Sequence, residues 1–278
     1  ISKNAKSIGD TVTGGAGNDT FTIANGFLTK LDSIDGGAGT NDVITIADET
    51  TLLDAAFTEV SNVEHLLGVS NLGLIATLEG EAAAAGITKV TLLDDAGADD
   101  NITVKSGFTN DLEIVLDDDA EINTIDATGY TKTLTVTGKT TDIGDAVNVF
   151  TGGSGTNILN LTAAADTIAA AQLAKVKNFD QINLVSTTTA DVSITLSDNN
   201  ATYTDNADYQ TLTVDGSALT TGKLTADATA EADGKLIIKG GGAVDTLTIS
   251  QSANFGDSIS GGAGDDDFIG HATAGNIK

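Results

Sequence analysis

Five short glycine clusters interrupt this chain, and each is followed at once by a run of strand-forming residues. The first reads GGAGNDTFT from Gly14, and the last reads GGAGDDDFI from Gly261. The other three begin at Gly36, Gly152 and Gly240. Glycine adopts positive φ at little cost, so such a cluster can turn the chain sharply between two strands. Repetition of one turn–strand unit favours a fold in which similar units stack on one another.

Short β-type runs occupy much of the remaining sequence. They are rich in threonine, valine, isoleucine and leucine, and they are separated by Gly, Asp and Asn. Several alternate apolar residues with threonine, which turns one face inward and a hydroxyl face outward. This pattern predicts an all-β protein of many short strands. The predicted strands cover residues 43–46, 101–104, 112–116, 134–138, 147–150, 158–161, 181–185, 192–196, 211–214, 235–239 and 246–249.

Two longer repeats also favour stacking. The cluster at Gly36 is followed by FTEVSNVEHLLG from Phe57, and the cluster at Gly152 is followed by LAKVKNFDQINL from Leu173. Both predict the order turn, strand, short helical segment, turn and strand. A second kind of unit begins with an aspartate and ends in a strand closed by glycine. It occurs at residues 126–138, 205–216 and 227–240.

We therefore predict a β-solenoid, or β-roll, of short and mostly parallel strands. A few short helices are expected, at about residues 50–58, 79–86 and 162–175. The alternative is a set of β-sandwich modules. We predict two repeat modules, residues 1–150 and 151–278, with one continuous elongated solenoid as the alternative division.

The chain is strongly acidic, with 40 Asp and Glu against 13 Lys and Arg and a formal net charge of -27. Nucleic acid needs a basic binding face and anionic membranes repel acidic chains, so neither is an expected partner. So much like charge destabilises a compact state unless positive charge lies among the carboxylates. No apolar run approaches the length of a membrane-spanning helix, so direct membrane insertion is not expected.

In the two complete glycine clusters, an aspartate occupies the same position of the nonapeptide. Asp19 and Asp266 are the sixth residues of their nonapeptides, and an apolar residue follows two positions later. Calcium takes about six to eight oxygen ligands, and a glycine turn can aim carbonyl oxygens at the same point as a carboxylate. Nine residues upstream stand Asp10 and Asp257, so each copy reads as two consecutive repeats. A winding with that period would stack successive turns and hold an ion between them.

The other clusters depart from this pattern. The second has one extra residue, so either Asn41 or Asp42 holds the ligand place. The third has the neutral Asn157 there, and in the fourth Ala243 replaces a glycine and only Asp245 brings charge. An ordinary Gly-Asn/Asp turn needs no metal and is the alternative, favoured at Asn157. The candidate metal-binding residues are Asp10, Gly14, Ala16, Gly17, Asp19, Asp32, Gly37, Ala38, Asn41, Asp42, Asp245, Asp257, Gly261, Ala263, Gly264, Asp265 and Asp266.

No catalytic group stands out in the sequence. The two histidines, His65 and His271, do not accompany a nucleophile in a known catalytic spacing, and cysteine is absent. Paired carboxylates hydrolyse glycosides in many enzymes, but forty acids make some pair inevitable. We therefore predict that the chain is not an enzyme. Its start, ISKNAKSIGD, lacks an initiator methionine and the apolar core of a signal peptide, so we interpret it as a fragment.

The glycine–aspartate nonapeptides resemble the calcium-binding repeats of the RTX family of secreted bacterial proteins. The Thr/Ala/Asp-rich composition, the absence of cysteine and the F-x-x-V-x-N-V-E-x-L cassette from Phe57 make the chain similar to RTX surface-layer (S-layer) proteins of Gram-negative bacteria. The resemblance implies type I secretion, a calcium-stabilised β-solenoid at the bacterial cell surface, and self-assembly into a two-dimensional lattice. Attachment to a cell-surface polysaccharide would use a region outside this chain. An RTX adhesin, or the calcium-binding C-terminal module of a secreted enzyme, is the alternative.

Overall fold

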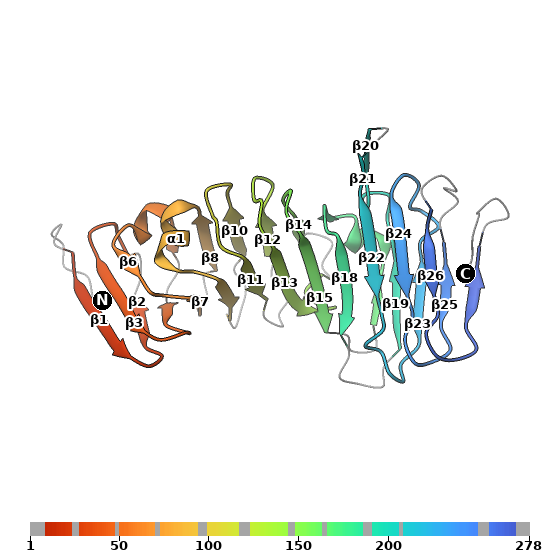
Figure 1. The fold of residues 1–278 in the computed structure, drawn as a ribbon, viewed down its shortest axis with the longest axis horizontal. Coiled ribbons are helices and arrows are strands. Elements are labelled where there is room, and N and C mark those ends of the chain that lie inside the picture. Colours follow the sequence, from red (N-terminus) through yellow and green to blue (C-terminus); the bar gives the residue numbers. More distant parts are fainter. Residues whose placement is uncertain are drawn as a thin grey trace. The chain divides into compact units, whose positions relative to one another are not determined.

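The chain is a parallel β-solenoid of about 9 turns (Figure 1). This fold comes from a computed structural model, which describes residues 9–23, 28–47, 50–69, 73–93, 99–116, 123–143, 148–162, 166–185, 191–205, 208–249 and 256–270. The predicted all-β solenoid is confirmed. The β-sandwich alternative is wrong, because neighbouring strands of the large sheets run parallel, as β2 and β4 or β22 and β24 do.

The described strands are short, and three one- or two-turn helices lie between them. The strands are β1 (Thr11–Ala16), β2 (Thr20–Ile23), β3 (Ser33–Ala38), β4 (Val43–Ile46), β5 (Thr50–Leu52), β6 (Val60–Ser61), β7 (His65–Gly68), β8 (Leu74–Leu78), β9 (Lys89–Leu92), β10 (Asp100–Val104), β11 (Leu112–Val115), β12 (Asn123–Asp126), β13 (Leu134–Lys139), β14 (Val149–Thr151), β15 (Asn157–Thr162), β16 (Asp166–Ile168), β17 (Val176–Lys177), β18 (Gln181–Val185), β19 (Val192–Thr195), β20 (Tyr203–Asp205), β21 (Asp208–Tyr209), β22 (Thr211–Asp215), β23 (Leu224–Asp227), β24 (Lys235–Lys239), β25 (Thr246–Thr248), β26 (Ser258–Ser260) and β27 (Asp267–Ile269). The helices are η1 (Asp54–Phe57), α1 (Gly80–Ala85) and α2 (Ala170–Leu173).

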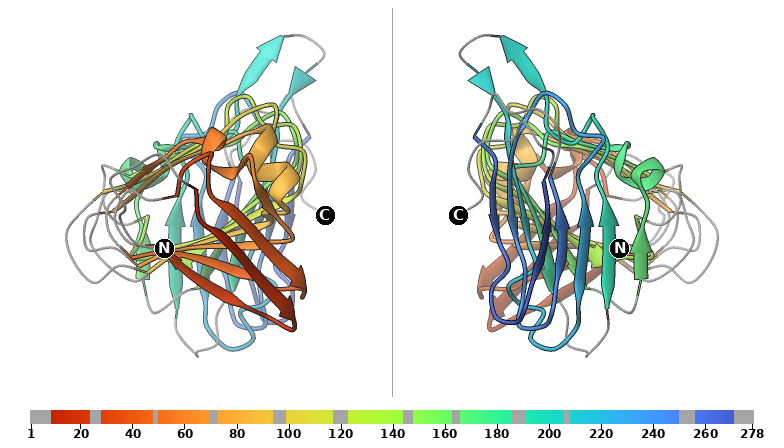
Figure 2. Two further views of the ribbon diagram at one scale, coloured as in Figure 1. Left: turned by 90° about the vertical axis from the view of Figure 1, so that its left-hand side faces the viewer. Right: turned by 90° about the vertical axis from the view of Figure 1, so that its right-hand side faces the viewer.

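The chain divides into two compact units. Unit 1 holds residues 1–135 and 152–155, and unit 2 holds residues 136–151 and 156–278. In unit 1 the parallel ladders are β2-β4-β7-β9-β11, β1-β3-β6 and β5-β8-β10-β12. In unit 2 they are β15-β18-β22-β24-β26 and β16-β19-β23-β25-β27, and β20 and β21 form an antiparallel hairpin. Figure 2 shows the strands of each ladder lying one behind another within their unit.

Columns of buried side chains hold the coils of each unit together. In unit 1 the register aligns one inward residue from each of five strands: Phe21, Ile44, Leu66, Val90 and Ile114. Equivalent columns fill unit 2, and the intervening residues of each strand face outward. Removing each such side chain from water stabilises the fold by roughly 1.5–3 kcal/mol. Because each apolar face is covered only by the next coil, stacking and folding occur together.

The predicted strands are confirmed, with ends that shift by at most two residues, although residue 147 lies outside the described part of the chain. Some of the strands that the sequence did not predict, such as β3 and β23, contain glycine, alanine or aspartate. Those residues have weak strand propensity, but parallel partners on both sides supply the backbone hydrogen bonds. Tertiary pairing therefore overrides local preference at these strands.

The predicted helices are confirmed only in part. The helix expected at 79–86 is α1, whereas the segment expected at 50–58 begins as the strand β5 and only then forms η1. Most of the segment expected at 162–175 is not helical either, since β16 precedes the single turn α2, and residues 163–165 lie outside the described chain. The coil leaves room for only one or two turns of helix between strands that must pair with the coils beside them.

The repeated cassette is confirmed down to its backbone turns. After the clusters at Gly36 and Gly152, both copies run strand, strand, short helix, two-residue strand, turn and strand. The turn residues Asn62 and Asn178 have φ of 53° and 58°, and they are the non-glycine residues with positive φ in the described chain. Asparagine tolerates this left-handed conformation better than other residues with a Cβ.

Asn62 offers a test of this turn. Asn62→Ala is expected to lower the free energy of unfolding by about 1–2 kcal/mol, because alanine resists the left-handed region. Asn62→Gly is the matched control, since it also removes the 2.8 Å hydrogen bond from Nδ2 to Oδ1 of Asp35 but accepts the same φ. Urea unfolding at fixed calcium measures both, and equal losses for the two variants would contradict the backbone argument.

Candidate metal centres

The glycine turns stack in pairs within each unit. In unit 1 the turn at Gly14 lies on the turn at Gly36, with Gly15 beside Gly37 and the Gly17 amide donating to the Ala38 carbonyl at 3.0 Å. In unit 2 the turn at Gly240 lies on the turn at Gly261: the Ala263 amide donates to the Gly241 carbonyl at 2.9 Å. The two turns of each pair are therefore separated in sequence by about one coil of the solenoid.

The expected nine-residue stacking is wrong. Asp10 and Asp19 begin strands of different sheets, and each lies beside a residue of the following coil. The Asp10 amide donates to Oδ1 of Asp32 at 2.9 Å, and the Asp19 amide donates to Oδ1 of Asp42 at 2.6 Å. Nine residues carry the chain from one sheet across the turn to another, so only a whole coil returns it to the same place.

Backbone conformation separates the complete nonapeptides from the degenerate clusters. The glycines at the second and fourth positions of the two complete copies have positive φ, from 93° at Gly262 to 126° at Gly15. Gly37 in the second cluster shares this feature, with φ of 95°. The clusters at Gly152 and Gly240 contain no residue with positive φ. The first and last turns and, in part, the second thus share one turn conformation.

Three acids form a ladder at the starts of β2, β4 and β7. The Asp19 amide donates to the Asp42 carboxylate, and the Asp42 amide donates to Oε2 of Glu64 at 2.8 Å. Asp42 is fully buried, whereas Asn41 is exposed, so Asp42 holds the ladder place that the sequence left open between them. Each coil thus contributes one carboxylate to the same edge of the sheet.

Two oxygens of this ladder stand without a hydrogen-bond partner in the described residues. They are the buried Oδ2 atoms of Asp19 and Asp42. A side-chain carbon on Gly14 would overlap Oδ2 of Asp19 and the carbonyl oxygen of Gly36. The equivalent carbon on Gly39 would come within 2.5 Å of Asp42 Oδ2 and 2.7 Å of the Gly17 carbonyl oxygen. Glycine therefore leaves space where carboxylate and carbonyl oxygens converge, a donor set that suits a hard cation.

Asp245 of the fourth cluster has the same position but different partners. It is also fully buried, and its Oδ1 accepts the Leu224 amide at 2.7 Å. Its Oδ2 accepts the Gly241 amide of its own turn at 2.6 Å. Both oxygens of Asp245 thus accept hydrogen bonds from backbone N–H groups, so this carboxylate does not need an ion as a further partner.

The remaining predicted aspartates differ in the hydrogen bonds that their carboxylate oxygens accept. Asp32 is buried, and its Oδ2 accepts both the amide and the hydroxyl of Thr29. Asp257 and Asp266 accept amides of the preceding coil, from Leu236 and Asp245, at 2.9 Å each. Several of the predicted residues are exposed to solvent, among them Asp10, Ala16, Ala38, Ala263 and Asp265.

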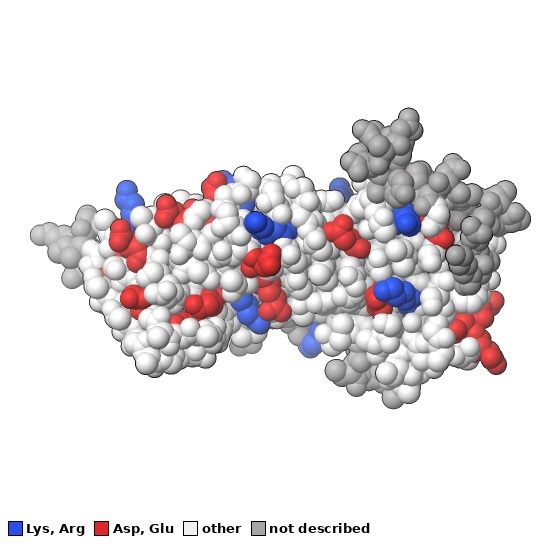
Figure 3. All heavy atoms as spheres, in the orientation of Figure 1, with Lys and Arg blue, Asp and Glu red and all other residues white. Residues whose placement is uncertain are grey.

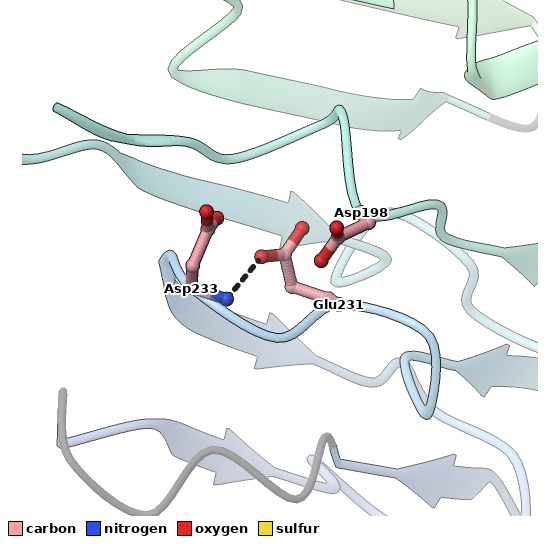
Figure 4. A group of neighbouring side chains, drawn as sticks. All are labelled: Asp198, Glu231 and Asp233. Carbon is pink, nitrogen blue, oxygen red and sulfur yellow. Dashed lines mark hydrogen bonds between the residues drawn. The ribbon is translucent and has the colours of Figure 1, made fainter.

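A third acidic group lies in unit 2 and was not predicted. Asp198, Glu231 and Asp233 each place one carboxylate oxygen within 4.8 Å of the others (Figure 4). Glu231 is 1% exposed, and its Oε1 accepts the amides of Asp233 and Gly234 at 3.2 and 2.9 Å. Burial raises the pKa of Glu231, although these hydrogen bonds oppose the rise. The group is a possible acidic metal-binding site, partly buried.

The sequence held one clue to this group. Glu231 and Asp233 belong to the repeat at 227–240, which reads DATAEADGKLIIKG and places both acids just before its strand. Asp198 lies 33 residues before Glu231, in the turn that follows β19. Since β19 pairs with β23, the two turns come from adjacent coils, and no local motif joins them.

The described residues show no histidine-dependent catalytic arrangement around His65. Its Nε2 lies 2.8 Å from Oγ1 of Thr91 on the neighbouring coil, and burial lowers the pKa of the imidazole. His65 is thus a cross-strand polar residue, while His271 lies outside the described residues. A shallow groove of about 520 Å³ in unit 1 includes two carboxylates. Glu113 there pairs with Lys89 at 3.1 Å, and Asp111 accepts the Thr133 amide at 3.0 Å.

The comparisons with known proteins leave the chain without an assigned family. No protein family, curated protein or solved structure matches it. Among the described residues, none of the helices has the length and apolar character needed to cross a membrane.

Proposed function

We propose that this chain is a structural protein of the bacterial cell surface, an RTX-type S-layer solenoid that folds and assembles when it binds calcium. The observation that carries the proposal is the pair of buried Oδ2 atoms of Asp19 and Asp42, which have no hydrogen-bond partner among the described residues where two glycine turns meet. An unpaired buried carboxylate oxygen is costly, and calcium would remove that cost while joining two coils.

The charge of the chain supports the same proposal. Acids outnumber bases by 40 to 13, and Figure 3 shows carboxylates spread over the visible face with lysines among them. In a cytoplasm poor in calcium the carboxylates would repel one another and keep the chain unfolded and exportable. Outside the cell, calcium that binds only the folded form would stabilise it by mass action.

Assembly follows from the same chemistry. Two copies of so acidic a chain repel each other, and divalent ions between their surfaces would allow them to meet. Carboxylates suit calcium in this role because they supply hard, charged oxygen ligands. The proposed partner is therefore a second copy of the chain, and the proposed role requires no catalytic group.

A calcium titration of the chelated chain tests this function. We expect circular dichroism to show β-structure forming as calcium is added, followed by a rise in light scattering and ordered sheets in electron micrographs. Sodium chloride at equal ionic strength is the control for general screening of charge. Assembly that persists unchanged in a chelator would contradict the proposal. Calcium-dependent folding to a stable monomer would instead favour the adhesin or enzyme-module alternative.

A further inference from the structure

We propose that Asp198, Glu231 and Asp233 of unit 2 form a binding site for a hard divalent cation, with calcium as the favoured ion. The site lies outside every glycine cluster, so it is distinct from the turns on which the proposed function rests. Its three carboxylates come from two adjacent coils, one from the turn after β19 and two from the turn before β24.

Burial of charge is the first argument. Glu231 is 1% exposed, and among the described residues no lysine forms an ion pair with any of the three acids. A buried carboxylate without a cationic partner is disfavoured unless other groups compensate its charge. Backbone amides donate hydrogen bonds to the Glu231 carboxylate, but they bring no net positive charge to a group of three acids.

The second argument concerns a carboxylate oxygen of Asp233. Oδ1 of Asp233 is closed off from solvent and accepts no hydrogen bond in the described residues. Asp233 shares a turn with the buried Glu231, and Figure 4 shows the Glu231 carboxylate between those of Asp233 and Asp198. An inaccessible carboxylate oxygen without a donor, next to two more carboxylates, is the arrangement that a bound cation would complete.

The amide hydrogen bonds around the group already hold it in place. Oε2 of Glu231 accepts the Ala201 amide at 3.2 Å, and Oδ1 of Asp198 accepts the Ala232 amide at 3.0 Å. Glu231 and Asp198 thus each receive a donor from the other coil, which brings the two turns together. A carboxylate oxygen can accept more than one partner, so these bonds leave capacity for a metal. Oxygen-only ligands select calcium, magnesium or manganese over softer metals.

Asp198 leaves the site open on one side. It is exposed, whereas Glu231 is buried, so water can complete the coordination shell and an ion can enter from solvent. Calcium accepts such a mixed set of carboxylates and waters at flexible geometry, whereas magnesium requires a near-ideal octahedron. An ion here would join two coils of unit 2, as the ion proposed at Asp19 and Asp42 would join two coils of unit 1.

Amide hydrogen exchange read by mass spectrometry tests the site in the full chain. The reporting amides are those of Ala201, Ala232, Asp233 and Gly234, which donate to the carboxylates themselves. Where exchange of these amides requires the site to open, we expect a free calcium concentration of 100 times Kd to slow it about 100-fold. Sodium chloride at equal ionic strength should not reproduce the effect. Unchanged exchange at these amides across the calcium titration would overturn the proposal.

Variants separate this site from the glycine turns. Asp198→Asn combined with Asp233→Asn should abolish calcium protection at residues 228–236 and keep it at residues 36–43. Asp227→Asn is the matched control, since it removes a charge nearby while asparagine can still accept the bonds from Thr229. Full protection at 228–236 in the double variant would reject the site. If that variant fails to fold, hydrogen exchange at the same amides of the wild type across the calcium titration still tests the site.

Discussion

Asp42→Asn is expected to stabilise the protein in a chelator and to destabilise it in calcium. Without calcium, the buried Oδ2 of Asp42 has no partner, and an unsatisfied buried polar atom costs about 1–3 kcal/mol. Asparagine removes the buried negative charge, and its Nδ2 would enter a space that the carbonyl oxygens of Gly17 and Asn62 also border. With calcium at about 1,000 times Kd, the wild type would gain about 4.1 kcal/mol that the neutral variant lacks. The difference in stability between the two proteins should therefore change sign.

Thermal or urea unfolding in calcium and in chelator measures this reversal, provided that both proteins are compared at equal ionic strength. Asp245→Asn is the matched control, because Asp245 is equally buried and occupies the equivalent turn. Its two oxygens accept backbone amides, so an Nδ2 there would face an N–H group. We expect Asp245→Asn to destabilise by about 1–3 kcal/mol in both conditions. Parallel behaviour of the two variants would show that Asp42 does not bind an ion.

Tyr130→Ala is expected to lower the free energy of unfolding by about 3–5 kcal/mol, the range for truncating a large buried aromatic side chain. Tyr130 is fully buried in unit 1, and its ring centroid lies 5.9 Å from that of Phe108. Its hydroxyl donates to the carbonyl oxygens of Asn110 and Thr133, two turn residues of adjacent coils. The side chain therefore contributes both packing and the closure of two turns.

A series of variants separates the two contributions. Tyr130→Phe keeps the ring and leaves the two carbonyl groups without their donor, so a loss of about 1–3 kcal/mol is expected. Leu93→Ala is the control for an apolar residue that is half exposed, and it should change stability by less than about 0.5 kcal/mol. Urea unfolding followed by circular dichroism at fixed calcium ranks the three. A Tyr130→Ala cost no larger than that of Leu93→Ala would contradict the role assigned to this residue.

The strands were predictable because their signal is local. Short runs rich in isoleucine, leucine and valine marked strands such as 181–185 and 235–239, and both are strands with those bounds. The helical segments were less predictable. Alanine at 162–175 suggested a helix, but the parallel partner β19 holds residues 166–168 as a strand. Pairing with another coil is not visible in the sequence of one segment.

The candidate sites divide in the same way. The nonapeptides at Gly14 and Gly261 marked turns whose glycines at positions two and four do have positive φ, because that conformation depends on the glycines themselves. The choice between Asn41 and Asp42 could not be made locally, since one extra residue shifts either into the ligand place. Burial of Asp42 against the neighbouring coils decides it.

The local amino-acid pattern was sufficient to identify a solenoid of short strands and the turns where carboxylates gather. It could not reveal which carboxylates need an ion: Asp42 and Asp245 look alike in sequence, but only Asp245 has backbone donors for both oxygens. It also could not bring Asp198 to Glu231, 33 residues away. Both features depend on contacts between coils, and the lengths of the intervening turns and strands, more than any motif, determine which residues meet there.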